Sequence, residues 1–130
     1  MTREEILEGN RLIVNFMGIR PVYNSYTGTF QWSDGVFFAT GDILYEEAMN
    51  NIVKYVKYSA SWDWIMPVVD AIETRSMGIY QVDILQEGCK IKNRCKSYID
   101  KTVSKVPEGT TKLESVWMAI VEFIKDVNKK

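Results

Sequence analysis

The chain contains no histidine, and this absence removes several kinds of chemistry. Imidazole is a common zinc ligand, the usual base beside a serine or cysteine nucleophile, and the side chain whose ordinary pKa lies nearest neutral pH. The sequence also lacks a phosphate-cradling glycine loop and a nucleophile elbow. We therefore expect a protein that is not an enzyme and that holds no cofactor or metal.

Cysteine is scarce, with Cys89 and Cys95 as the only two. If both lie on one extended segment, six residues at about 3.3 Å each place them about 20 Å apart. A disulfide tolerates a Cα separation of no more than about 7 Å. We expect two free, mostly buried thiols.

Long apolar runs and an excess of one charge are missing too. No stretch of about 18 apolar residues and no apolar signal core is present. Sixteen basic and seventeen acidic residues leave a formal net charge of −1. The protein therefore has no overall positive charge that would attract nucleic acid or an acidic membrane. The 130 residues, 46% of them hydrophobic, suffice for one core. We predict a single domain over residues 1–130, soluble and cytoplasmic, with no membrane partner.

Four amphipathic stretches predict helices. Capping boxes at Thr2 with Glu5 and at Thr111 with Glu114 mark the first and last, and Gly18 ends the first. Asp42 is expected to cap the second, whose end at residues 53–58 could also extend as a strand. The residues expected in the core are Ile6, Ile13, Phe16 and Met17; Tyr45, Ala48, Met49, Ile52, Val53 and Val56; Met66, Val68, Val69 and Ile72; and Leu113, Val116, Trp117, Ile120, Val121, Ile124 and Val127.

The strongest pattern in the chain marks the start of the third helix: Ser61-Trp62-Asp63-Trp64-Ile65-Met66-Pro67. With Asp63 as N-cap, Pro67 would occupy the fourth helical position, where its missing N–H costs no helical hydrogen bond. Met77 and Gly78 are expected to close this helix.

Two hairpins are predicted between the helices. Asp34-Gly35 is a two-residue turn signal between residues 30–33 and 36–39, and Glu87-Gly88 is a turn signal between 79–85 and 89–93. Residues 96–109 form either a third strand through Tyr98 and Ile99 or a loose connection. The predicted fold class is α+β, an α/β sandwich with a small, mainly antiparallel sheet packed by about four helices.

A basic stripe is one candidate binding feature. Its members alternate along the chain, so an extended backbone would direct all of them to one face: Lys90, Lys92, Arg94 and Lys96. Such cations could receive the phosphates of a nucleic acid or nucleotide. We favour the simpler interpretation, a solvent face whose lysines discourage pairing between sheet edges.

Trp62 and Trp64, with the aromatic-rich segment 23–38, are the other candidate. They could stack on bases or on a partner peptide, but large aromatic side chains more often seal the edge of a core. Asp63, Asp70 and Glu73 would be needed for any metal-dependent enzyme, and hard cations require more oxygen ligands than this spacing offers. Capping and solvation explain these carboxylates adequately.

Three blocks of sequence together resemble one family. They are Glu8-Gly9-Asn10-Arg11-Leu12-Ile13 with Phe16-Met17-Gly18; Ser61-Trp62-Asp63-Trp64-Ile65-Met66-Pro67-Val68-Val69 with Ile72-Glu73; and Lys112-Leu113-Glu114-Ser115-Val116 with Val121-Glu122-Phe123-Ile124-Lys125. The chain is similar in these blocks to the phage ABA-sandwich family of bacteriophages, prophages and mobile elements. The resemblance implies a sheet between helices and action in a bacterial host, and it brings no catalytic residues. Residues 28–58 depart from the family pattern in being longer, more aromatic and more helical in pattern.

The leading hypothesis is a non-enzymatic binding or interaction module whose partner is an unidentified protein or a small ligand. Its alternative is nucleic-acid or nucleotide binding through the basic stripe. A homodimer is compatible with both.

Overall fold

A computed structural model describes residues 2–24, 26, 29–31, 37–40, 45–85, 88–93, 100–102 and 111–128. The chain divides into two compact units, Met1–Val56 (unit 1) and Lys57–Lys130 (unit 2). The single domain over residues 1–130 stays a prediction.

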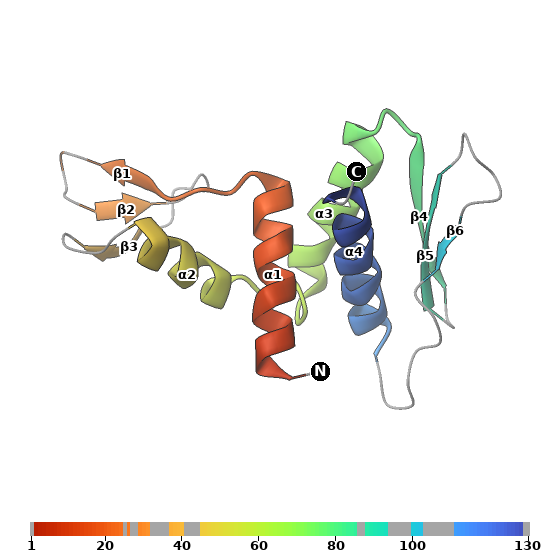
Figure 1. The fold of residues 1–130 in the computed structure, drawn as a ribbon, viewed down its shortest axis with the longest axis horizontal. Helices are drawn as coiled ribbons and strands as arrows, with labels where there is room; N and C mark the ends of the chain where they lie inside the picture. Colours follow the sequence, from red (N-terminus) through yellow and green to blue (C-terminus); the bar gives the residue numbers. More distant parts are fainter. Residues whose placement is uncertain are drawn as a thin grey trace. The chain divides into compact units, whose positions relative to one another are not determined.

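Unit 1 combines two helices with three short strands in its described part (Figure 1). The strands form an antiparallel sheet in the order β1-β2-β3, and α2 packs against both β3 and α1. A hydrogen bond from the guanidinium of Arg11 to Oδ1 of Asn50 joins the two helices. The elements are α1 (Arg3–Met17), β1 (Val22–Asn24), β2 (Thr29–Gln31), β3 (Phe37–Thr40) and α2 (Tyr45–Tyr55).

Both predicted ends of α1 are confirmed. Thr2 and Glu5 form the reciprocal capping box, with the Glu5 N–H donating to Thr2 Oγ1 over 3.1 Å. At the other end Gly18 adopts a left-handed φ of 75°, and the Ile19 N–H donates to the Val14 carbonyl over 3.1 Å. This hydrogen bond defines a Schellman ending, and the two residues that it joins, Val14 and Ile19, are both buried.

The first hairpin is confirmed, but its register differs from the predicted one. A two-residue turn at Asp34-Gly35 would place Gln31 opposite Phe38, whereas Gln31 stands opposite Phe37. The turn residues themselves lie outside the described part of the chain. Strand β1, which pairs with β2, was not predicted at all.

Helix α2 continues to Tyr55, so the alternative of a strand beginning at residue 53 is wrong. Its predicted stripe is buried except for Tyr45, the first residue of the helix, which is half-exposed. The predicted cap Asp42 lies outside the described residues.

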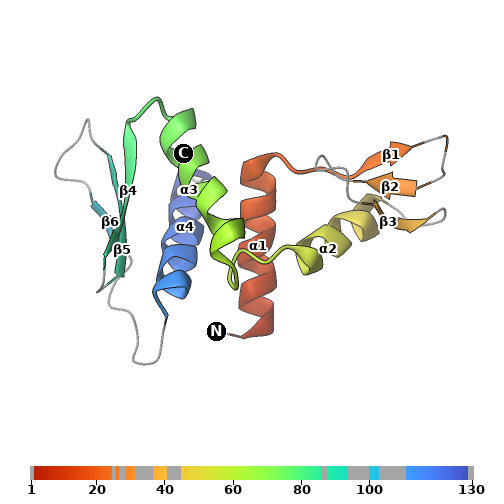
Figure 2. The same cartoon turned by 180° about the vertical axis from the view of Figure 1, so that it is seen from behind.

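Unit 2 places two helices on one side of a sheet (Figures 1 and 2). Its described strands are antiparallel in the order β4-β5-β6; α4 packs against all three, and α3 packs against β4 and α4. The elements are α3 (Trp62–Arg75), β4 (Tyr80–Leu85), β5 (Gly88–Asn93), β6 (Asp100–Thr102) and α4 (Lys112–Asn128).

The second hairpin is confirmed with a corrected turn. Leu85 stands opposite Gly88, so Gly88 is the first residue of β5 rather than a turn residue. The third strand also exists, as β6 over residues 100–102, whereas Tyr98, Ile99 and residues 103–109 lie outside the described part.

Two predictions about α3 are wrong. Ser61 is the N-cap, because it is extended and its carbonyl accepts the Ile65 N–H over 3.1 Å. Pro67 is therefore the sixth helical residue, and it deprives the Asp63 carbonyl of its helical donor. Asp63 and Pro67 are both exposed, and the helix continues past the proline to Arg75. Met66, expected in the core, is 38% exposed.

The core of unit 2 lies between α4, α3 and the sheet. On α4 the predicted Val116, Trp117, Ile120, Val121 and Ile124 are buried, and so are Ser115, Ala119 and Phe123. Leu113 is half-buried and Val127 is exposed, which corrects the two ends of the predicted stripe. The ring of Phe123 meets that of Tyr80 edge to face at 4.8 Å, which joins α4 to β4.

The predicted α+β class, with four helices and antiparallel strands among the described residues, is confirmed. None of the helices in that part of the chain is long and apolar enough to cross a membrane.

Candidate functional site

The two described members of the basic stripe, Lys90 and Lys92, lie on the sheet face opposite α4. Cys89 and Ile91 point to the core at 1% and 0% exposure, so Lys90 and Lys92, which alternate with them on β5, point the other way. Arg94 and Lys96 lie outside the described residues, as does Cys95.

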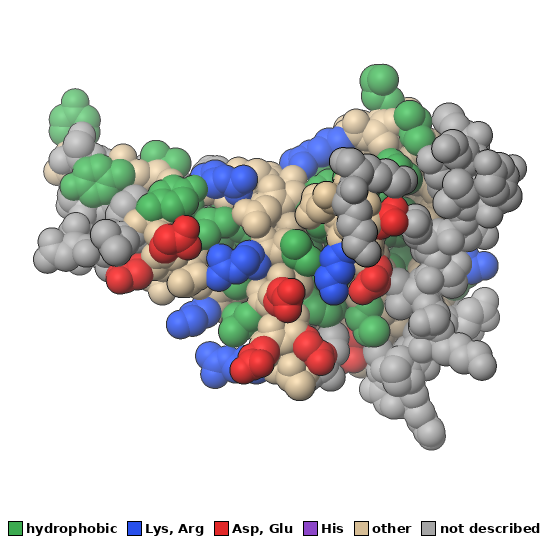
Figure 3. Space-filling view, viewed as in Figure 1, with side chains coloured by type: hydrophobic (Ala, Val, Ile, Leu, Met, Phe, Trp, Pro, Cys, Tyr) green, Lys and Arg blue, Asp and Glu red, His purple; other side chains and the backbone are tan. Residues whose placement is uncertain are grey.

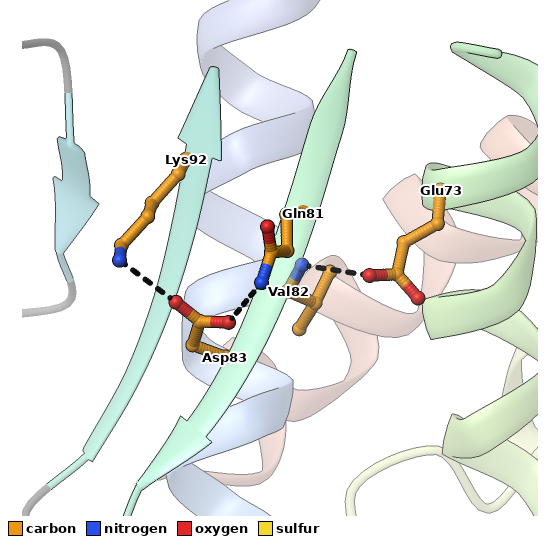
Figure 4. A network of polar contacts seen from close by, with 5 residues as sticks. All are labelled: Glu73, Gln81, Val82, Asp83 and Lys92. Atoms are coloured by element: carbon orange, nitrogen blue, oxygen red, sulfur yellow. Dashed lines mark hydrogen bonds and ion pairs between the residues drawn. The ribbon is translucent and has the colours of Figure 1, made fainter. Parts of the chain in front are cut away.

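Side chains from β4 compensate part of the stripe's charge (Figure 4). The ammonium of Lys92 is 3.0 Å from Oδ2 of Asp83, and Nε2 of Gln81 donates to Oδ1 of the same carboxylate over 2.9 Å. The hydrogen bond from Lys92 lowers the pKa of Asp83, against the opposing effect of burial; Gln81 and the charge of Lys90 lower it further. The described end of the stripe is thus a mixed-charge face. On the side of the molecule drawn in Figure 3, acidic and basic side chains are likewise interspersed.

Helix α3 blocks the free edge of β4, a role that the sequence did not predict for its residues. Oε2 of Glu73 accepts the Val82 N–H over 3.1 Å, and Oγ of Ser76 accepts the Tyr80 N–H over 3.0 Å. Ser76 also donates to the Glu73 carbonyl over 3.1 Å. We call Glu73 and Ser76 the edge clamp. An edge strand normally offers unpaired N–H groups to another chain, and the clamp occupies two of them.

The Glu73 carboxylate accepts a hydrogen bond from β4, so it does not form a cluster with the carboxylates of Asp63 and Asp70. Among the described residues, no group of three histidine, cysteine, aspartate or glutamate side chains could hold a metal ion.

Cys89 is a free, buried thiol, as predicted. Burial raises its pKa to about 12, and the negative charge of Asp83 adds to the rise. A thiol of this pKa carries almost no thiolate near neutral pH, so Cys89 is unsuited to nucleophilic or redox chemistry.

The two tryptophans of α3 point to different sides of the helix, because residues two apart are separated by about 200°. Trp64 is half-buried, and its ring meets that of buried Tyr58 edge to face at 5.6 Å. Trp62 is 39% exposed. Trp64 therefore packs as the simpler interpretation predicted, and Trp62 is the more exposed of the two tryptophans of α3.

Trp62 belongs to a continuous exposed surface, which we call the α3 outer face: Trp62, Asp63, Met66, Pro67 and Asp70. Trp62 and Met66 are four residues apart, so they are neighbours on the helix surface. Asp63 and Asp70 are two turns apart on the same side, and neither forms an ion pair with a described residue.

The sequence held a signal for this face that the core prediction overlooked. Ile65, Val68, Val69 and Ile72 are all buried and follow the spacing i, i+3, i+4, i+7 of a complete core stripe. Met66 falls outside that stripe and is therefore left to solvent.

Unit 1 exposes apolar side chains as well. Tyr26 is 99% exposed, while Val22, Tyr23, Tyr45 and Tyr55 are each about half-exposed. Among the other aromatic residues of segment 23–38, Phe30, Phe37 and Phe38 belong to β2 and β3, and Trp32 lies outside the described residues.

Comparisons with known proteins find no matching family model, and no curated protein or solved structure matches the chain. The resemblance to the phage ABA-sandwich family consequently stays a prediction.

Proposed function

We propose that this protein is a non-enzymatic binding module that contacts a partner protein through the α3 outer face. One observation carries the proposal: Trp62 and Met66, at 39% and 38% exposure, lie side by side on a helix whose apolar stripe of Ile65, Val68, Val69 and Ile72 is already buried. Tryptophan is enriched among the residues that dominate binding energy at protein interfaces, and methionine is enriched at interfaces generally. In keeping with the sequence blocks that resemble phage ABA-sandwich proteins, we place the module among phage or prophage accessory proteins acting in the bacterial cytoplasm.

The way α3 is held supports this use. Its inner face buries Ile65 and Val68 completely, and the edge clamp ties its C-terminal half to β4. A surface carried on a well-anchored helix loses little conformational freedom on binding, so more of the contact energy appears as affinity.

Site-specific photo-crosslinking in a bacterial host tests the proposal. Benzoylphenylalanine replaces Trp62 in one variant and Met77, which is 89% exposed beyond the end of α3, in the control. We expect a discrete adduct from position 62 and none from position 77. Excess unlabelled wild-type protein should suppress the adduct, whereas the Met66→Asp variant should not. Equal adducts at the two positions, or no adduct at position 62, would contradict the proposal.

Nucleic-acid binding through the basic stripe is the alternative, and the ion pair between Lys92 and Asp83 weighs against it. Fluorescence anisotropy with a labelled single-stranded DNA at low and physiological salt separates the two proposals. We expect no saturable binding at physiological salt with DNA concentrations up to about 100 µM, a value that corresponds to the weakest dissociation constants typical of non-specific DNA binding. Tight, salt-sensitive binding that disappears when Lys90, Lys92, Arg94 and Lys96 are replaced by glutamine would favour the alternative instead.

A further inference from the structure

We propose that the α3 outer face docks a basic amphipathic helix, whose lysines or arginines lie two turns apart beside an apolar residue. This inference rests on the proposed function, since it names the partner chemistry of the same surface. It follows from the positions of two carboxylates and two apolar side chains on α3.

Asp63 and Asp70 are separated by seven residues, which corresponds to a rise of about 10.5 Å and a rotation of only about 20° around the helix. Trp62 and Met66 form the adjacent row of the same face. A partner helix that repeats every seven residues could therefore place one cation at each carboxylate and an apolar side chain against Trp62 and Met66.

The negative charge of the α3 outer face favours a positively charged partner. Asp63 and Asp70 are exposed, and neither has an ion-pair partner among the described residues. Arg75 is the one cation of α3, and its position on the helix lies about 120° away from Asp63 around the axis. An acidic partner would bring like charges together, whereas a basic one would pair both carboxylates.

The same argument disfavours a two-fold symmetric dimer through this surface. In a two-fold symmetric contact the same patch meets itself, so the α3 outer face would meet a face of the same negative sign. A basic partner meets no such repulsion. One of its cations could in addition lie over the exposed indole of Trp62, which is a favourable cation–π geometry.

The test uses two labelled helical peptides of three heptads, with leucine at the a and d positions. One carries lysine at the e and g positions and the other carries glutamate. Fluorescence anisotropy at physiological salt measures the affinity of each for the full-length protein. We expect saturable binding of the lysine peptide and at least about tenfold weaker binding of the glutamate peptide, the size of effect that two ion pairs and their reversal produce.

Charge reversal on the protein locates the binding. The double variant Asp63→Lys/Asp70→Lys is compared with Glu46→Lys/Glu47→Lys, which reverses two exposed carboxylates on α2. Both variants change the formal net charge from −1 to +3, so they differ only in where the charge changes. We expect the α3 variant to bind the lysine peptide about tenfold more weakly and the α2 variant to change affinity less than about twofold. The neutral pair Asp63→Asn/Asp70→Asn, expected to lose about threefold, serves if the lysine variant fails to fold.

Equal effects of the two charge reversals would overturn the inference, because binding would then depend on overall charge. Failure of the lysine peptide to bind wild-type protein would overturn it too. Equal binding of both peptides, abolished by Met66→Asp, would overturn the basic partner and leave the proposed function in place. Photo-crosslinking from position 62 tests the proposed function independently of this inference.

Discussion

Truncation of Glu73 to alanine is expected to destabilise unit 2 through a single lost hydrogen bond. The carboxylate accepts the Val82 N–H over 3.1 Å at the free edge of β4, in a partly buried position. A hydrogen bond to a charged group contributes about 1.5–3 kcal/mol to stability. Water can reach part of this edge after truncation, so we expect a loss of about 1–2 kcal/mol in the free energy of unfolding.

Urea unfolding followed by tryptophan fluorescence measures that loss, and amide hydrogen exchange shows where it arises. The protection of the Val82 amide should fall in the Glu73→Ala variant more than that of the Ile91 amide on β5. The matched control is Asp70→Ala, which removes an exposed carboxylate from the same helix and should change stability by less than about 0.5 kcal/mol. Glu73→Gln keeps an acceptor oxygen and should lose less than the alanine variant.

The reasoning about the edge clamp would be refuted if Glu73→Ala and Asp70→Ala unfolded at the same urea concentration with equal slopes. Unchanged protection of the Val82 amide in the Glu73→Ala variant would refute it as directly, because the hydrogen bond would then contribute nothing at the β4 edge.

Three further predictions concern the sheet. The pKa of Asp83 is lowered from 3.8 in the folded protein, so its contribution to stability is present above pH 3.8 and is lost as the pH falls through the lower pKa of the folded state. The Lys92→Met variant should therefore lose less stability on acidification than the wild type does, as measured by the urea midpoint from pH 6 down to about pH 2.5. In a Cys95→Ser background the Cys89 thiol, with a pKa raised to about 12, should react with a thiol reagent only as fast as the protein unfolds, and prompt labelling of native protein would contradict its burial. Ile91→Ala, at a fully buried position under α4, should cost about 2–5 kcal/mol in urea unfolding, and a cost near zero would mean that the site collapses around the smaller side chain.

The helices were largely predictable because their signals are local. A capping box needs only two side chains three residues apart, and the ending at Gly18 needs only a glycine after an apolar stripe. Both features appear in the structure where the sequence placed them. The N-cap error at α3 is also local: Ser61 and Asp63 are both good N-cap residues two positions apart, and the choice of Ser61 moved Pro67 from the fourth to the sixth helical position.

The candidate site was only partly predictable. The buried stripe through Ile65 and Ile72 does not distinguish the two tryptophans, because Trp62 and Trp64 lie about 70° and 90° from its centre. Trp64 is the one that packs because its ring meets that of Tyr58, a residue outside the helix. The sequence could not show that Glu73 serves the β4 edge, because this contact depends on where the strand begins and on which side it pairs.

By itself the sequence determined the α+β class, the four helices of the described chain, the two hairpins and the burial of Cys89, since short-range periodicity and capping specify each of them. Tertiary structure alone decided the strand registers, the pairing of Lys92 with Asp83, and the blocking of the β4 edge by Glu73 and Ser76. These contacts join residues on different elements. Their partners depend on strand pairing and helix packing, and a one-residue change of register would direct each side chain to the opposite face of the sheet.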